Sequence, residues 1–171
     1  MSKNLILYYS RDGENYVNGS VKSLAKGNTE IAAEYIEKAV GGDLFKIETV
    51  KSYPADYYEC IDIAKAELRE QSRPELKEYI RDISEYDNIF VCGPCWWGTY
   101  PMAMFSQLDK LDTAGKKIIP LMTHEGSGMG SSVRDLKKCC KKASFGEPLA
   151  VHGAMAAQSE AVISGWAKNQ V

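Results

Sequence analysis

Two cysteines and two tryptophans lie together in one short segment: residues 92–95 read CGPC, and Trp96 and Trp97 follow directly. Two thiols separated by two residues can form a redox dithiol when one of them is exposed and has a lowered pKa. Two adjacent indoles beyond a buried strand could instead form a flat apolar wall for a planar ring. The alternative is that one indole packs beneath the loop and the other covers a helix.

A second candidate binding segment is Gly27-Asn28-Thr29, at the start of a predicted helix. Free amides at a helix N-terminus bind anions, and the side chains of Asn28 and Thr29 add donors. Ser10, at the end of the first predicted strand, can reach the same place. The alternative is that Asn28 or Thr29 only caps the helix. Neither the Walker pattern nor G-x-G-x-x-G occurs, so the anion is not expected to be a triphosphate or pyrophosphate bound in those ways.

Residues 123–132 (THEGSGMGSS) form a third candidate segment, with hydroxyl groups and glycine amides that a ligand could approach closely. The alternative is a plain mobile loop. His124 has no Cys/His cluster around it. Cys139 and Cys140 are adjacent in a predicted helix and are expected to point to different sides, so no zinc site is predicted.

The elements that must position these segments are strands and helices, which alternate about five times along the chain. Apolar runs predict strands at residues 5–9, 44–48, 88–92, 117–123 and 149–152, although Pro120 is unfavourable in the fourth. Helical periodicity and stop signals predict helices at residues 28–40, 56–69, 101–111, 131–142 and 156–168. Residues 11–27 are predicted to form a loop. The alternation predicts a parallel sheet with helices on both faces, whose ligand site lies beyond the carboxyl ends of the strands.

The composition is that of one domain spanning residues 1–171, with 44% hydrophobic and 26% charged residues. The formal net charge of −2 gives no basic excess to bind nucleic acid or a membrane. No apolar run approaches the ~18 residues that span a bilayer, and no signal peptide is recognisable. The five cysteines show no framework spacing. We therefore expect a cytoplasmic protein with reduced thiols.

Together, the anion site, the aromatic wall and the glycine-rich edge make this sequence similar to the flavodoxin family. The segments YYS, GNT, GPCWWGTYP and THEGSG match, in order, the phosphate loop and the two flavin-flanking loops of that family. The resemblance covers nearly the whole chain. It implies a flavodoxin-like three-layer α/β/α sandwich, a five-stranded parallel sheet in the order 2-1-3-4-5, and noncovalently bound flavin mononucleotide (FMN).

The resemblance also assigns the contacts of FMN. It places the phosphate on Ser10, Arg11, Asn28 and Thr29, and the flavin ring against Trp96 or Trp97. Glu125, beside the pyrimidine side of the ring, would disfavour an anionic reduced flavin. The remaining flavin contacts of the two flanking loops are Pro94, Cys95, Gly98, Thr123 and Gly126.

The chain departs from the family pattern at residues 12–26, because the family usually has only a few residues between its serine and Gly-Asn-Thr. The phosphate cradle is expected to form if Arg11 and Lys26 come together at the base of a protruding loop. That loop could cover the flavin, bind a partner or do neither. Asn15 and Tyr16 are candidate flavin contacts on it.

The resemblance implies electron transfer through FMN, with two functions open. One is a carrier between partner proteins, which the lack of a second nucleotide fingerprint favours. The other is an NAD(P)H-dependent quinone or flavin reductase, which is favoured because the chain is less acidic than a carrier steered to basic partner proteins is expected to be. A cofactor-free scaffold and a dithiol oxidoreductase are further alternatives. Cys92 continues the apolar run 89–91 and is expected to be buried and inert, which disfavours the dithiol. The oligomeric state stays open.

Overall fold

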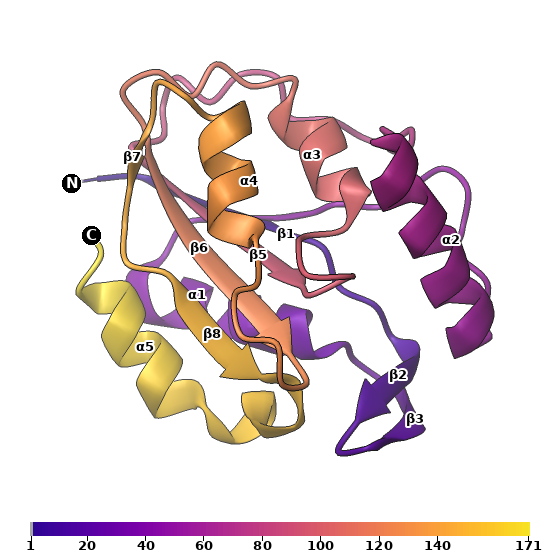
Figure 1. The fold of residues 1–171 in the computed structure, drawn as a ribbon. Helices are drawn as coiled ribbons and strands as arrows, with labels where there is room; N and C mark the ends of the chain where they lie inside the picture. The colour runs from indigo at the N-terminus through magenta and orange to yellow at the C-terminus, as the bar shows by residue number, and fades with distance from the viewer. Residues whose placement is uncertain (1) are drawn as a thin grey trace.

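The computed structural model describes residues 2–171, in which a parallel sheet lies between two layers of helices (Figure 1). The strand order is β4–β1–β5–β6, and β7 and β8 share the fifth position, both parallel to β6. The predicted three-layer fold and the order 2-1-3-4-5 are therefore confirmed. The sheet is built from β1 (Asn4–Tyr8), β4 (Asp43–Lys46), β5 (Asn88–Pro94), β6 (Lys117–His124), β7 (Ser144–Phe145) and β8 (Leu149–His152).

The central strands are apolar throughout because both faces of the sheet are covered. Ile6 packs toward the layer of α1 (Asn28–Val40) and α5 (Glu160–Lys168). Its neighbours Leu5 and Leu7 pack into the opposite core cluster. That second layer is formed by α2 (Tyr57–Glu70), α3 (Met102–Leu108) and α4 (Ser132–Cys139).

Pro120 is accommodated at the point where the fifth position of the sheet changes strand. Ile118 accepts a hydrogen bond from Gly146 N at 2.8 Å, so it faces β7. Pro120, two residues further on, faces the same side, where β7 has ended and β8 has not begun. Its missing N–H therefore removes no bond from the sheet.

The prediction that residues 11–27 form a loop is wrong, because most of this segment is a β-hairpin. Strands β2 (Gly13–Val17) and β3 (Ser20–Leu24) pair antiparallel and form a separate two-stranded sheet. Asn18 and Gly19 connect them with φ values of 49° and 86°. A two-residue turn with both φ values positive is the type I′ hairpin turn, for which Asn-Gly is the preferred sequence. The dipeptide Asn18-Gly19 therefore already indicated a hairpin turn in the sequence.

Three helices also differ from the predictions. The helix predicted at residues 101–111 ends at Leu108. The helix predicted at residues 131–142 ends at Cys139. The last predicted helix is divided into a 3₁₀ segment, η1 (Gly153–Gln158), and α5. Within residues 2–171, no helix is long and apolar enough to cross a membrane.

Candidate functional site

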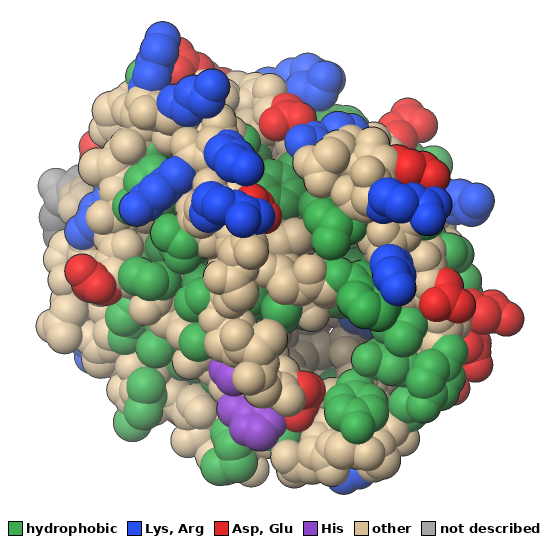
Figure 2. Space-filling model, in the orientation of Figure 1, with side chains coloured by type: hydrophobic (Ala, Val, Ile, Leu, Met, Phe, Trp, Pro, Cys, Tyr) green, Lys and Arg blue, Asp and Glu red, His purple; other side chains and the backbone are tan. Residues whose placement is uncertain are grey.

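A cavity of about 270 Å³ opens where β1, β5 and β6 end, and α2 and the hairpin complete its wall. Figure 2 shows the hollow beside the chain's two histidines, with hydrophobic side chains on its other rim. All predicted site residues except Gly98 and Gly126 line it: Ser10, Arg11, Asn15, Tyr16, Asn28, Thr29, Pro94, Cys95, Trp96, Trp97, Thr123 and Glu125.

The start of α1 forms one end of the cavity. Asn28 and Thr29 are the first two residues of the helix, and Gly27 holds the cap position. The alternative that Asn28 or Thr29 only caps α1 is therefore wrong. Ser10 Oγ accepts the N–H of Glu30 at 3.1 Å. The amides of Asn28 and Thr29 donate to no residue within the described chain, so they are free to bind an anion.

Gly27 allows this close approach of β1 and α1. A Cβ atom at this position would lie 2.1 Å from Ser10 Oγ and 2.6 Å from the carbonyl oxygen of Arg11. No larger residue fits without displacing the end of β1. Further along, the hydroxyl groups of Thr29 and Thr123 share a hydrogen bond of 2.7 Å and are buried. This contact ties α1 to the end of β6.

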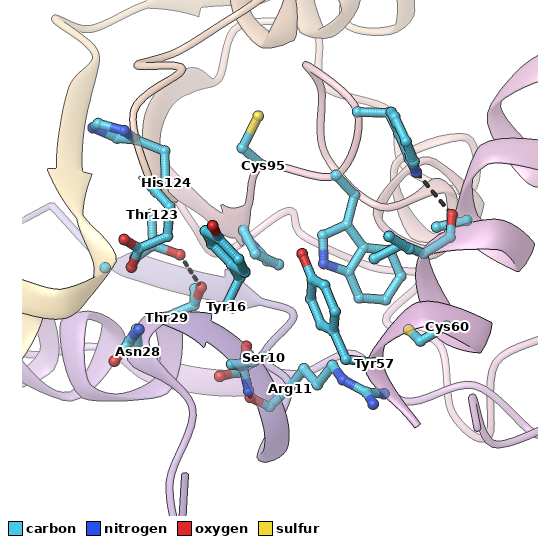
Figure 3. Close-up of a pocket in the computed structure, with 18 residues that line it drawn as sticks. Ser10, Arg11, Tyr16, Asn28, Thr29, Tyr57, Cys60, Cys95, Thr123 and His124 are labelled. Carbon is cyan, nitrogen blue, oxygen red and sulfur yellow. Dashed lines mark hydrogen bonds between the residues drawn. The ribbon is translucent and has the colours of Figure 1, made fainter. Parts of the chain in front are cut away.

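The two cations expected at the base of the hairpin do not meet there. The guanidinium of Arg11 donates to the carbonyls of Glu14, Pro54 and Ala55 at 2.9–3.0 Å and points toward α2 (Figure 3). Lys26 forms an ion pair with Glu34 at 2.8 Å. The chain closes at this base, where Gly27 packs against Ser10 and Arg11, but the side chains of Arg11 and Lys26 point to different partners. Arg11 lines the cavity, but its guanidinium makes no contact that would hold a phosphate at α1.

The two tryptophans occupy different positions in the cavity wall. Trp96 packs edge-on against Tyr9 and Tyr53, with ring centroids 5.1 Å apart in both pairs. Trp97 is 47% exposed, and its Nε1 donates to the carbonyl of Ile61 in α2 at 2.8 Å. The alternative that one indole packs beneath the loop and the other covers a helix is therefore correct in part, with Trp96 as the packed indole and Trp97 as the indole on α2. Both indoles nevertheless line the cavity.

Gly98 and Gly126 shape the adjacent turns and lie outside the cavity wall. Trp97 and Gly98 have φ values of 57° and 85°, and Trp96 N donates to Thr99 O at 2.8 Å, which closes a tight turn. The carbonyl of Gly98 accepts the N–H of Ser131 at 2.6 Å. The N–H of Gly126 donates to Nδ1 of His124. Direct flavin contacts from these two glycines stay a prediction.

The mouth of the cavity carries a tyrosine pair that bridges the hairpin and α2. Tyr16 and Tyr57 stack with centroids 6.1 Å apart and an interplanar angle of 27°, and both project into the cavity in Figure 3. Glu14 Oε2 accepts the N–H of Tyr57 at 2.7 Å, which fixes the hairpin to the start of α2. The flavin contacts predicted from the sequence do not include Tyr57 or the other wall residues Cys60, Ile61, Ala64, His124 and Gly153.

Glu125 joins three elements at the far side of the cavity. Its Oε2 accepts the N–H of Asn18 at the hairpin tip at 3.3 Å and lies 2.8 Å from Nε2 of His152. Its Oε1 accepts the N–H of Ala154 in η1 at 3.1 Å. His124 stacks on His152 at 5.8 Å, and burial together with this neighbour lowers the pKa of His124. Residues 2–171 contain no group of three or more potential ligands that could hold a metal ion.

The CGPC segment has no geometry for a dithiol. Cys92 is fully buried in the core cluster beneath α1 and α5, and burial raises its pKa. Cys95 packs against the cluster on the other face of the sheet. Gly93 lies between them because a Cβ there would come within 2.6 Å of the ring of Tyr100. Packing therefore accounts for the motif, and the structure gives the dithiol alternative no support.

Comparison with known proteins agrees with this geometry. The family model described as flavodoxin matches residues 21–170, so the chain belongs to the flavodoxin family. No curated protein matches the chain.

Solved structures of similar fold include candidate flavoproteins of two Bacteroides species. The protein from Bacteroides eggerthii DSM 20697 has 27% identity and a TM-score of 0.78, covering 99% of this chain and 98% of its own. That from Bacteroides uniformis ATCC 8492 has 26% identity and a TM-score of 0.75, covering 98% of each chain. A flavoprotein from Lactobacillus acidophilus NCFM, solved in complex with FMN, shares the fold at 20% identity and a TM-score of 0.67, covering 92% of this chain and 98% of its own.

Proposed function

We propose that the cavity binds FMN noncovalently and that the protein transfers electrons through it. The observation that carries this proposal is the pairing of two chemically different ends in one cavity. One end offers free helix amides and a serine hydroxyl, and the other offers aromatic side chains. A ligand that combines a phosphate with a planar ring matches both ends.

At the phosphate end, the protein supplies donors without a cationic side chain. The amides of Asn28 and Thr29 are free, and the positive end of the α1 dipole adds to their attraction for an anion. Ser10 Oγ already accepts a bond from Glu30 N, so its hydrogen is available to donate to an anion. The side chain of Asn28 adds a further donor at the cavity wall.

At the ring end, Trp96, Trp97 and Tyr57 provide flat surfaces that exclude water and orient a planar group. Bound FMN would supply the acceptor and donor of one or two electrons, and the protein sets its position and surroundings. The edge contacts of Trp96 with Tyr9 and Tyr53 hold this indole in place before a ligand arrives.

A carrier that exchanges electrons with a partner protein is the first form of this function. Support comes from the exposed position of Trp97, which places the aromatic wall at the protein surface. An NAD(P)H-dependent quinone or flavin reductase is the second form. The stacked Tyr16–Tyr57 pair at the mouth favours it, because this pair offers an aromatic surface to a second planar molecule.

The visible absorption spectrum of the purified protein tests FMN binding, and a steady-state assay then separates the two forms. We expect the two visible bands of a bound flavin, and release of FMN on denaturation. A protein that binds no flavin after incubation with FMN would refute the proposal. Rapid turnover of NADH or NADPH with a quinone would identify a reductase. A carrier would show no such turnover, but after photoreduction it would pass electrons to a protein acceptor.

A further inference from the structure

The end of α4 carries a pair of adjacent thiols whose sulfur atoms are in contact. Sγ of Cys139 lies 3.5 Å from Sγ of Cys140. The expectation that they point to different sides is wrong, because α4 ends at Cys139. Cys140 has φ −113° and ψ 53°, outside the helical region, and its side chain turns back toward Cys139.

The two thiols differ in access to solvent. Cys140 is fully buried in the core cluster that includes Leu136. Cys139 is partly exposed, and its Sγ also lies 3.4 Å from the carbonyl of Leu136. An oxidant from solvent therefore meets Cys139 first, with Cys140 directly behind it. This is the arrangement of an attacking thiol and a resolving thiol.

The surroundings of the pair carry charges of both signs. Four exposed lysines flank it in sequence, and none of them forms an ion pair within the described chain: Lys137, Lys138, Lys141 and Lys142. Nearby cations stabilise a thiolate, whereas the carboxylate of Asp109 raises the pKa of both thiols. The hydrogen bond between the two sulfurs lowers the pKa of Cys140 and raises the pKa of Cys139, so Cys140 can hold the thiolate and accept the proton that the two sulfurs share.

We propose that Cys139 and Cys140 form a reversible intramolecular disulfide when the protein meets a hydroperoxide. Cys139 passes its proton to the Cys140 thiolate as its sulfur attacks a peroxide oxygen, the O–O bond breaks, and the remaining alkoxide or hydroxide takes a proton and leaves. Cys139 becomes a sulfenic acid. The Cys140 sulfur then attacks this sulfur, the S–S bond forms, and the S–O bond breaks to release water. Two thiols and one hydroperoxide thus give one disulfide, one alcohol or water molecule, and one water molecule.

The geometry makes this disulfide easy to reduce again. Consecutive Cα atoms are about 3.8 Å apart across a trans peptide, below the range of about 4.4–6.8 Å that disulfides usually span. The small ring that forms is therefore strained, and strained disulfides are the labile ones. Closure needs the two sulfur atoms to move from 3.5 Å to about 2 Å, which the residues beyond the end of α4 must accommodate.

Mass spectrometry of the protein as purified tests the proposal. The protein is treated with hydrogen peroxide, its free thiols are alkylated, and trypsin is added. Cleavage after Lys138 and after Lys141 releases a peptide, residues 139–141, that contains both thiols. We expect this peptide to become unalkylated and lighter by two hydrogen atoms, and dithiothreitol to restore double alkylation.

Two variants assign the roles. In Cys140→Ser, Cys139 should persist as a sulfenic acid that dimedone traps, because the resolving thiol is gone. Cys95→Ser is the control and should leave the 139–141 disulfide unchanged. The proposal is overturned if peptide 139–141 stays doubly alkylated at peroxide doses that oxidise Cys95, or if its disulfide joins two chains. Neither result depends on flavin binding.

Discussion

At the scale of single residues, small side chains at the start of α1 decide where an anion can be held. Gly27 lets the chain pass against Ser10 and Arg11, and Asn28 and Thr29 then present free amides to the cavity. The guanidinium of Arg11 is held by three carbonyls instead. The affinity of this end should therefore depend on polar donors more than on cations.

Replacing Asn28 with alanine should weaken FMN much more than riboflavin, which lacks the phosphate. A hydrogen bond to a charged group contributes about 1.5–3 kcal/mol, which corresponds to one to two decades in affinity. Fluorescence titration with both flavins measures the difference. Asn169→Ala, at the exposed end of α5, is the matched control and should bind both flavins as the wild type does. Equal losses for FMN and riboflavin in Asn28→Ala would reject the assignment.

The two cysteines of the CGPC segment should behave as unrelated residues. In Cys92→Ser, a hydroxyl group replaces a thiol in a fully apolar cluster, and an unpaired buried hydroxyl costs about 1–3 kcal/mol of folding free energy. Cys95→Ser should change the free energy of unfolding little, because Cys95 is only partly buried. Urea unfolding measures both. The double variant should retain flavin, and a flavin-bound double variant that has lost all electron transfer would restore the dithiol interpretation.

At the scale of elements, the hairpin is a separate unit attached to the cavity at its two ends. Arg11 and Glu14 bind it to the segment that begins α2, and Asn18 binds its tip to Glu125. It pairs with no strand of the main sheet. Between these attachments it presents Tyr16 to the cavity. The hairpin can therefore be altered without disturbing the core.

Tyr16→Ala should weaken FMN and riboflavin to a similar extent, by about tenfold, because Tyr16 stacks on Tyr57, which we assign to the ring end of the cavity. An aromatic pair contributes about 0.5–1.5 kcal/mol beyond its buried area, and 1.4 kcal/mol is a factor of ten. Tyr58→Ala is the matched control, since Tyr58 is 61% exposed and lies outside the cavity wall. Titration with both flavins should separate the two variants. If Tyr16→Ala binds flavin as tightly as Tyr58→Ala does, the hairpin has no part in the site.

At the scale of the whole molecule, the buried parallel strands could be predicted from sequence because continuous apolar runs are typical of a sheet covered on both faces. The segments Leu5–Tyr9 and Ile89–Cys92 carried that signal. Most of the cavity wall could also be predicted, since loops at the carboxyl ends of such strands meet at one edge. The proposal that the cavity binds FMN rests on the family resemblance as well as on these residues.

The rest depends on contacts between distant parts of the chain. β7 has only two residues and no periodicity to detect. The direction of Arg11 is set by carbonyls of residues 54 and 55, which no local pattern reveals. α2 lines the cavity because of how this helix packs against the rest of the fold. In the sequence, only the adjacent aromatic residues Tyr57 and Tyr58 indicated such a role. The contact of Cys140 with Cys139 follows from the early end of α4.

The stability of the whole protein should fall as the pH is lowered from about 7 to 5. The folded protein lowers the pKa of His124, whereas the unfolded chain takes up this proton near the ordinary value of about 6.5. Below about pH 6.5 the unfolded state binds more protons than the folded state does. The folding stability that His124 contributes above this pH is therefore lost as the pH falls toward the lowered pKa of His124 in the folded protein. His152 and Glu125 are the titratable groups that face His124. Urea midpoints should fall less steeply for His124→Gln, and identical slopes would contradict this account.

The most direct test of the central claim is a titration of the flavin-free wild-type protein with FMN and with riboflavin, repeated in excess inorganic phosphate. The account predicts that FMN binds about ten to a hundred times more tightly than riboflavin, because only FMN engages the free amides of α1. It also predicts that phosphate weakens FMN and leaves riboflavin unchanged. Equal affinities for the two flavins, or no binding of either, would contradict it.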